Sequence, residues 1–236
     1  MSPDQRRSAI VDAALAVAER KGLAGTTVRD VATEMGSSSG LIHHYFASMD
    51  VVLAAAFERA AERDLQATAA AMAAAPDPTA ALVAFFEAYA PIEADRAFQF
   101  WLDAWAEAAR RPAVRATSVR LNLAWQALLQ RAIEAGLAAR RFRCPDPAGA
   151  AWRIMSLIDG LALQVVAHGT TLSRADVIAW AELAAEHELG VAAGGLSGGR
   201  IRGVPRPTAR PIASARSSMS ASVAMAAMAP IPRGAM

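Results

Sequence analysis

The sequence predicts an all-α protein, in which an N-terminal three-helix head with a helix-turn-helix precedes a larger helical domain. Alanine, the strongest helix former, is abundant, and apolar residues make up 54% of the 236 residues. Apolar side chains recur every three to four residues, and the alternating pattern of strands is absent. Prolines and glycines fall between the periodic segments, where they interrupt a helix at least cost.

Three helices are expected in the head. Residues 4–21 carry one apolar face, and the glycine that follows stands where helices commonly end. Thr27 and Asp30 have the spacing of a capping box that opens a second helix, and Gly36 ends it. The serines at 37–39 can cap a third, short helix with their hydroxyl groups.

The helices of the larger domain are expected between prolines or capping serines. They are predicted at about 49–75, 79–90, 92–110, 113–138, 146–168 and 173–190. The breaks fall at Pro76–Pro78, Pro91, Pro112, Pro145 and Ser173, where a missing N–H does least harm or a hydroxyl can cap. The last two helices have broad apolar faces, so residues 146–190 are expected to form a homodimer interface.

The C-terminal segment has a different composition. Residues 193–236 are rich in Gly, Pro, Ser and Arg, which cannot build a core and predicts a disordered tail. Its six arginines, with no acids, could add non-specific affinity for DNA, or the tail could be solvated and without a role. The expected domains are therefore 1–50, 51–192 and 193–236.

Composition also limits the class of protein. Charged residues interrupt the N-terminus, so no signal peptide is predicted, and no apolar run of about 18 residues predicts a membrane span. We therefore expect a cytoplasmic protein. No phosphate-binding glycine loop, nucleophile elbow or paired carboxylate frame is present, so neither an enzyme nor a cofactor is predicted. Cys144, the single cysteine, lies among arginines; an incidental linker residue is preferred over a redox sensor.

The stretch 36-GSSSGLIHHYFASMD-50 predicts the turn and second helix of a helix-turn-helix. Ala32 is small enough to let the two helices cross closely, and Gly36 permits the turn backbone. The second helix of such a unit enters the major groove with its N-terminal residues at the base edges. Here those residues are Ser37, Ser38, Ser39 and Gly40.

The residues from Thr26 to Ala32 and from Gly36 to Ser48 resemble the head of the TetR family of transcriptional repressors. The segments Phe100–Ala108 and Leu157–Leu161 resemble the C-terminal half of its betaine-regulator (BetI-type) branch. The resemblance implies a dimer that binds a palindromic double-stranded DNA operator and is released by a small-molecule effector. It implies phosphate contacts from Thr27, His44 and Tyr45, and groove contacts from Ser38, Ser39, Gly40, Leu41 and His43.

Two positions depart from that family. Position 49, usually lysine, is Met49, and position 37, usually valine, is Ser37. Loss of the lysine removes one charge that could meet a phosphate. Residues 1–50 also carry five basic and six acidic side chains. We therefore expect modest non-specific affinity for DNA; a helical dimer that has lost DNA binding is the alternative.

His43 and His44 could suggest a metal site. Neighbouring helical residues point about 100° apart, so the pair cannot readily chelate one ion, and no further ligand stands at a suitable spacing. No metal is predicted, and DNA contact is preferred over histidines without a role. Protonation of either ring near phosphate would strengthen DNA binding as pH falls.

Aromatic residues indicate a ligand site in the larger domain. Phe98, Trp101 and Trp105 share one helix face, and Trp125 and Trp152 lie on two other helices. Such rings can cage a quaternary ammonium ion, although a stripe of this kind is more often core. The resemblance points to a choline-like effector; a lipophilic or drug-like cation is the alternative. Asn122 and Asp159 are polar candidates on apolar helices, with Asp159 either meeting the cation or bridging the dimer interface.

Overall fold

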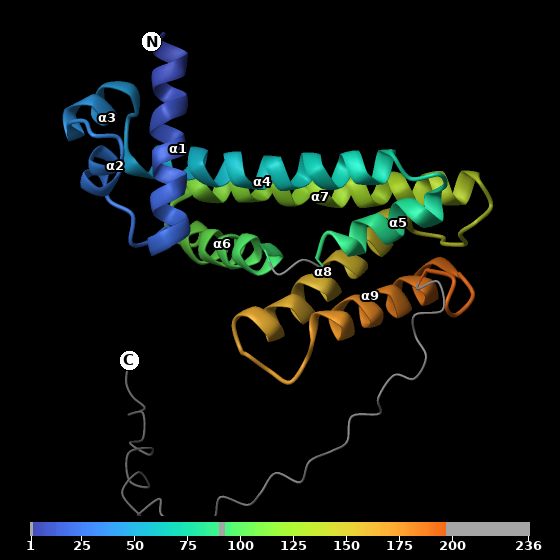
Figure 1. The fold of residues 1–236 in the computed structure, drawn as a ribbon. Coiled ribbons are helices and arrows are strands. Elements are labelled where there is room, and N and C mark those ends of the chain that lie inside the picture. The colour runs from blue at the N-terminus through green and yellow to red at the C-terminus, as the bar shows by residue number, and fades with distance from the viewer. Residues whose placement is uncertain (1, 90–92, 197–236) are drawn as a thin grey trace, which may run out of the picture. The chain divides into compact units, whose positions relative to one another are not determined.

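The structure, a computed structural model, describes residues 2–89 and 93–196, with residues 93–95 described by their backbone alone. These residues form nine α-helices and no strand (Figure 1), which confirms the predicted fold class. The helices are α1 (Pro3–Lys21), α2 (Val28–Glu34), α3 (Ser39–Tyr45), α4 (Met49–Ala73), α5 (Pro78–Glu87), α6 (Glu93–Ala108), α7 (Pro112–Ala138), α8 (Pro147–Val166) and α9 (Arg174–Leu189). The predicted break at Pro91 lies outside the described residues.

Local signals in the head account for its helix ends. Asp30 N donates to Thr27 Oγ1 over 3.2 Å, and Thr27 N donates to the Asp30 carboxylate over 3.0 Å, as the capping box predicts. Gly22 and Gly36 have φ values of 77° and 61°, which glycine adopts without strain. The predicted serine cap of α3 is wrong in one respect, because Ser38 occupies the N-cap position but its side chain makes no capping hydrogen bond.

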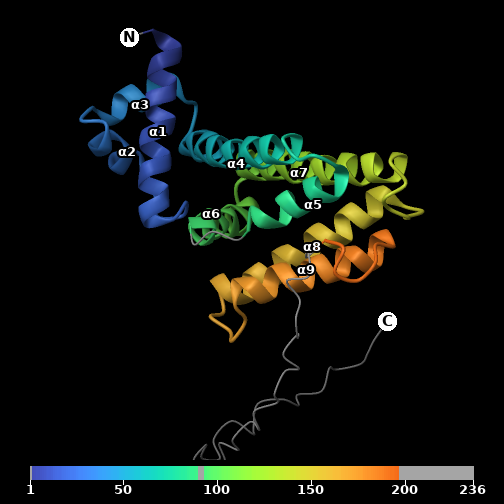
Figure 2. The same cartoon turned by 45° about the vertical axis from the view of Figure 1, so that its right-hand side comes forward.

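The head and the larger domain share a hydrophobic core. In Figures 1 and 2, α2 lies against α1 and α3 packs on α2, while α4 and α7 lie side by side. One cluster of buried residues extends from α1–α3 across residue 50 into α4, α6 and the first half of α7. A second cluster joins α5, α7, α8 and α9, and Trp125 packs against both. The long helices α4 and α7 therefore connect the head mechanically with the rest of the domain.

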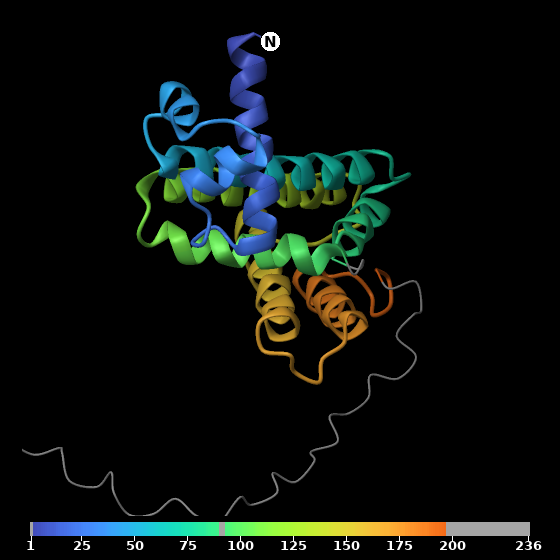
Figure 3. The same cartoon turned by 60° about the vertical axis from the view of Figure 1, so that its left-hand side comes forward.

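The last two helices form a pair, which Figure 3 shows below α4 and α7. By length and mean hydropathy alone, 1.2, α8 could cross a membrane, and its residues Ile154 and Ile158 are buried in the second cluster. After α9 the chain turns back: Gly194 N and Leu196 N donate to the carboxylate of Glu186 over 3.0 and 2.9 Å. Residues 193–196 thus belong to the folded unit, and the remainder of the predicted tail, 197–236, lies outside the described residues.

Candidate functional site

The outer face of α3 carries most of the residues predicted to contact DNA. Ser38, Ser39, Gly40, His43 and His44 are exposed there. Leu41 and Tyr45 are half-buried. The His44 ring meets the Tyr45 ring edge to face, with centroids 5.0 Å apart. Within the described residues no group of three His, Cys, Asp or Glu side chains could hold a metal ion. The face offers hydroxyls, imidazoles and one glycine at which a DNA backbone could approach closely.

Arg7 holds the C-terminal end of α3 against α1. Its Nη1 donates to the carbonyl oxygen of Tyr45 over 2.5 Å, and its guanidinium lies 4.5 Å from the centre of the Phe46 ring. A cation at a helix C-terminus interacts favourably with the unpaired carbonyls and the helix dipole. Arg7 therefore positions α3. No spacing rule reveals a contact between residues so far apart in sequence.

Two charged pairs reduce the positive charge that the head offers to phosphate. Arg20 pairs with Glu34 and Lys21 pairs with Asp30, each over 2.5 Å. Asp30 also accepts from the amide and the hydroxyl of Thr27, over 3.0 and 2.6 Å. The two groups through which Thr27 was expected to reach phosphate therefore already donate to a carboxylate. DNA contact at Thr27 requires that capping arrangement to open.

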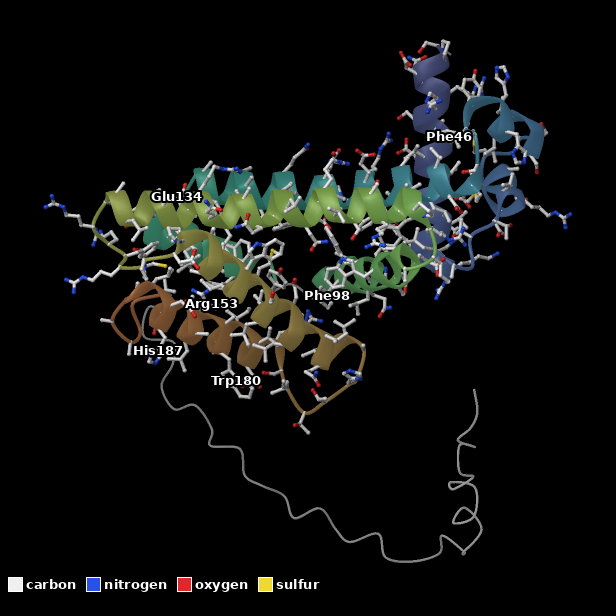
Figure 4. All side chains as sticks on the ribbon, turned by 180° about the vertical axis from the view of Figure 1, so that it is seen from behind. Phe46, Phe98, Glu134, Arg153, Trp180 and His187 are labelled. Atoms are coloured by element: carbon white, nitrogen blue, oxygen red, sulfur yellow. The ribbon has the colours of Figure 1, made fainter. Side chains whose placement is uncertain are left out.

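A cavity of about 550 Å³ lies among α4, α5, α6, α7 and α8. Six of the seven predicted ligand residues line it: Phe98, Trp101, Trp105, Asn122, Trp125 and Asp159. Phe98 lies where α6 approaches α8, as Figure 4 shows. The volume is within the range of about 300–1,000 Å³ that small-molecule sites occupy.

The aromatic residues of α6 form one wall of this cavity. The Trp105 ring packs edge to face on Phe98, with centroids 5.9 Å apart, and lies 5.8 Å from the Trp101 ring. Trp101 rests in turn on the buried Phe57 of α4, with centroids 4.9 Å apart. Because each ring is held by another, the wall presents fixed aromatic surface, which attracts a cation through the ring quadrupole.

Asp159 of α8 brings a carboxylate to this aromatic wall. Tyr89 Oη donates to Asp159 Oδ1 over 3.1 Å, and both residues line the cavity. Burial raises the pKa of Asp159 to about 6, although the hydrogen bond from Tyr89 opposes the rise. Burial and the neighbouring carboxylate raise the pKa of Tyr89 well above its usual value, so the phenol stays neutral and donates. Within the part of the chain that the structure describes, Asp159 forms no ion pair, and a carboxylate shielded from water in this way favours a cation as ligand.

The sequence-based description of the cavity needs two changes. Trp152 does not line it; its side chain is 41% exposed on the outer face of α8, because the tryptophan points away from the second core cluster. Tyr89 was missed, and so was Asp64 of α4. Nothing in a single sequence pairs Tyr89 with a residue three helices further on. Asn122 faces the cavity, but its amide nitrogen already donates to Ser118 O over 2.9 Å.

Comparison with known proteins identifies the family. Residues 10–56 match the family described as bacterial regulatory proteins, tetR family, and residues 78–190 match the C-terminal domain of BetI-type transcriptional repressors. The HTH-type transcriptional regulator BetI of Paraburkholderia phytofirmans is 35% identical over 167 residues, 67% of this chain and 80% of that protein. The chain belongs to the TetR family. Against two other curated BetI regulators the match spans 58% of their length.

Two solved structures of ligand complexes are similar to this chain in fold. A putative transcriptional regulator from Saccharomonospora viridis, crystallised in complex with choline, is 25% identical, covers 79% of this chain and 98% of its own, and superposes with a TM-score of 0.70. The multidrug binding protein EbrR, complexed with ethidium, is 26% identical, covers 76% of this chain and 98% of its own, and has a TM-score of 0.57. The predicted class, a TetR-family transcriptional regulator related to the BetI branch, is confirmed.

Ser37 is one of the two departures from the TetR pattern, and the structure changes its predicted role. Its hydroxyl oxygen is buried and has no hydrogen-bond partner within the described chain, so it does not face the DNA groove. A buried hydroxyl without a partner costs about 1–3 kcal/mol. The side chain lies beneath the α2–α3 turn, where an apolar residue would suit the packing.

Replacing Ser37 with valine, the usual family residue, is expected to raise the free energy of unfolding by about 1 kcal/mol, because the unpaired hydroxyl is removed. Urea unfolding at fixed protein concentration measures the change. Ser38→Ala is the matched control, since the Ser38 hydroxyl makes no capping bond and its loss should change little. Destabilisation by Ser37→Val would contradict this description of the site.

Met49 is the other departure. It is the first residue of α4, half-buried against the head core. Met49→Lys is expected to steepen the dependence of operator affinity on salt by about one counterion, because the lysine stem can keep the packing while the ammonium reaches phosphate. Fluorescence anisotropy over a range of salt concentrations measures the slope. Met49→Gln, polar but uncharged, should leave the slope unchanged; equal slopes for all three proteins would exclude a phosphate contact here.

Proposed function

We propose that this TetR-family protein is a repressor that acts in the cytoplasm as a homodimer and binds a palindromic DNA operator. Residues 1–50 serve as the DNA-binding unit, with the exposed residues of α3 in the major groove. Residues 51–192 hold the effector and the partner subunit. The exposed hydroxyls and imidazoles of α3 support this role, as does the anchoring of that helix by Arg7.

The dimer interface in this proposal is the outer face of α8 and α9. Trp152, Leu157 and Leu183 are large apolar side chains that are 41%, 38% and 36% exposed on these two helices. Figure 4 shows the Trp180 side chain on α9 and Arg153 on α8. Arg153 forms a double hydrogen bond with Glu188, over 2.9 and 2.8 Å, which ties the two helices into one surface. Pairing with the same face of a second copy would form a four-helix interface about a twofold axis.

The effector in this proposal is a choline-like cation. The observation that carries it is the partly buried carboxylate of Asp159 in a cavity with an aromatic wall. The rings of Phe98, Trp101, Trp105 and Trp125 would surround the quaternary ammonium group, and Asp159 would balance its charge. A relative crystallised with choline and the match to BetI regulators support the same class.

A gel shift with the DNA upstream of the protein's own gene tests both halves of the proposal. We expect a sequence-preferring complex at low salt that millimolar choline dissociates, because an effector that binds the DNA-incompetent state better shifts the population towards it. Thermal unfolding with choline measures effector binding independently of DNA. No sequence-preferring shift would overturn the repressor assignment and favour a helical dimer that has lost DNA binding. No thermal stabilisation by choline would overturn the choline-like effector.

A lipophilic, drug-like cation is the second candidate effector, favoured by the ethidium complex of EbrR and by the size of the cavity. Competition separates the two classes. If choline is the effector type, it should displace a fluorescent cation such as ethidium and release operator DNA. If ethidium binds the cavity and releases DNA while choline does neither, the protein is a sensor of lipophilic cations.

A further inference from the structure

A second carboxylate lines the cavity from the side of α4. Asp64 shares one face of that helix with Ala67, Thr68 and Ala71, and all four belong to the cavity wall. Asp159 enters the same cavity from α8, bonded to Tyr89. The two carboxylates therefore belong to different helices and to different local environments within one site.

Among the described residues, Asp64 has one ion pair, a long one with the neighbouring Arg63. Arg63 Nε lies 3.9 Å from Asp64 Oδ1, beyond hydrogen-bond distance, and the Arg63 side chain is 66% exposed whereas that of Asp64 is 29% exposed. The Asp64 carboxylate accepts no hydrogen bond from the described part of the chain. Burial accordingly raises the pKa of this carboxyl. A half-buried carboxylate in this condition gains from any cation that enters the cavity.

The described side chains of the cavity wall carry more negative than positive charge. Among the described residues that line the cavity, Asp64, Glu87 and Asp159 are acidic and Arg63 is basic. Walls of low dielectric strengthen the attraction of such a site for positive charge. One quaternary ammonium group beside Asp159 would leave Asp64 with only the exposed guanidinium of Arg63, 3.9 Å away, as its counter-charge.

Size allows a larger effector than choline. The cavity, about 550 Å³, lies in the range that drug-sized ligands occupy. A cation the size of choline would leave part of this space, with its aromatic and methyl surface, in contact with water. An apolar linker would fill that space and bury further apolar area.

We propose that the cavity prefers a dication in which an apolar linker joins two positively charged groups, one near Asp159 against the aromatic wall and one near Asp64. The proposal rests on the proposed function, since it specifies the effector of the same cavity. Asp64 is the residue that distinguishes a dication from a monocation, whereas Asp159 serves both.

Isothermal titration of the full chain tests this specificity. The probes are bis(trimethylammonium) alkanes of increasing chain length, each paired with the alkyltrimethylammonium ion of the same chain. At the best length, the dication should bind about tenfold more tightly than its monocationic partner. The apolar end of the monocation already gains free energy by contact with the apolar wall, which reduces the difference in affinity between the two probes. A tighter dication therefore indicates a favourable interaction of its second charge.

Two isosteric variants assign the two positions. Asp64→Asn should weaken the dication more than the monocation, so that the preference for the dication is lost. Asp159→Asn should weaken both probes. Thermal unfolding without ligand shows whether each variant is folded. If Asp64→Asn is folded but leaves the ratio of dication to monocation affinity unchanged, the assignment of Asp64 is wrong.

The outcomes separate this inference from the function on which it rests. If monocations bind and every dication binds no better than its partner, the preference for a dication is wrong while the cation-responsive regulator stands. If neither class of cation binds, both are wrong. If the dication is preferred but does not release operator DNA, the specificity stands and the repressor mechanism is wrong.

Discussion

Replacing Asp159 with asparagine is expected to weaken choline binding by about tenfold or more and to abolish the pH dependence of that binding. Choline keeps its charge at every pH, so any pH dependence must come from the protein. The asparagine keeps the size of the side chain and can still accept the hydrogen bond from Tyr89, but it carries no charge to balance the ammonium group. Losing one member of a desolvated charge pair costs on the order of 2 kcal/mol or more.

The sign of the pH dependence follows from the raised pKa of Asp159, about 6 in the empty cavity. The cation favours the ionised carboxylate, so binding releases a proton whenever the carboxyl is protonated. Above pH 7 the group is ionised and affinity should be constant. At pH 5, about nine-tenths of the molecules carry a protonated Asp159, so affinity should fall about tenfold. Isothermal titration with choline between pH 5 and pH 8, without DNA, measures this dependence.

Tyr89→Phe supplies the matched control for the assignment. The hydrogen bond from Tyr89 lowers the pKa of Asp159, so its removal should move the midpoint of the affinity profile to higher pH while the ring remains in place. A wild-type profile that is flat from pH 5 to pH 8, or an Asp159→Asn variant that binds choline as the wild type does, would contradict the role of Asp159 as counter-charge.

Local sequence signals were sufficient for the architecture of the head. Thr27 and Asp30 formed the expected capping box, and Gly36 adopted the positive φ that the turn needs, because these features depend on neighbours within one or two helical turns. The buried hydroxyl of Ser37 and the anchor from Arg7 were not foreseeable from spacing. Both depend on how α1, α2 and α3 pack in three dimensions.

The residues of the cavity likewise fall into those that local sequence signals predict and those that depend on packing. Helical periodicity placed Phe98, Trp101 and Trp105 on one face, and that face does line the cavity. Whether Trp152 lines the cavity depends on the orientation of α8. Trp152 faces outward, while Met155 and Asp159, three and seven residues later, face the cavity. Periodicity gives which residues share a face, but the side of the helix that meets its neighbours comes from the packing of all five helices around the cavity.

Replacing Phe57 with alanine is expected to lower the free energy of unfolding by about 3–5 kcal/mol, the largest effect on stability that we predict for a single substitution. Phe57 of α4 is fully buried in the core that the head shares with the larger domain. Its ring packs edge to face on Trp101, with centroids 4.9 Å apart, and lies 6.2 Å from the Phe100 ring. Alanine would leave a cavity and remove both aromatic contacts. Urea unfolding at one protein concentration measures the change, since the stability of the proposed dimer would depend on concentration.

The same substitution should also weaken effector binding, because Trp101 rests on Phe57 with one side and lines the cavity with another. Phe57→Leu should lose less stability, as it keeps most of the buried volume, and its effect on choline affinity should be correspondingly smaller. Val119→Ala, on a side chain 52% exposed, is the surface control and should change stability by less than about 0.5 kcal/mol. A Phe57→Ala variant that loses stability but binds choline unchanged would show that the aromatic wall does not depend on support from α4.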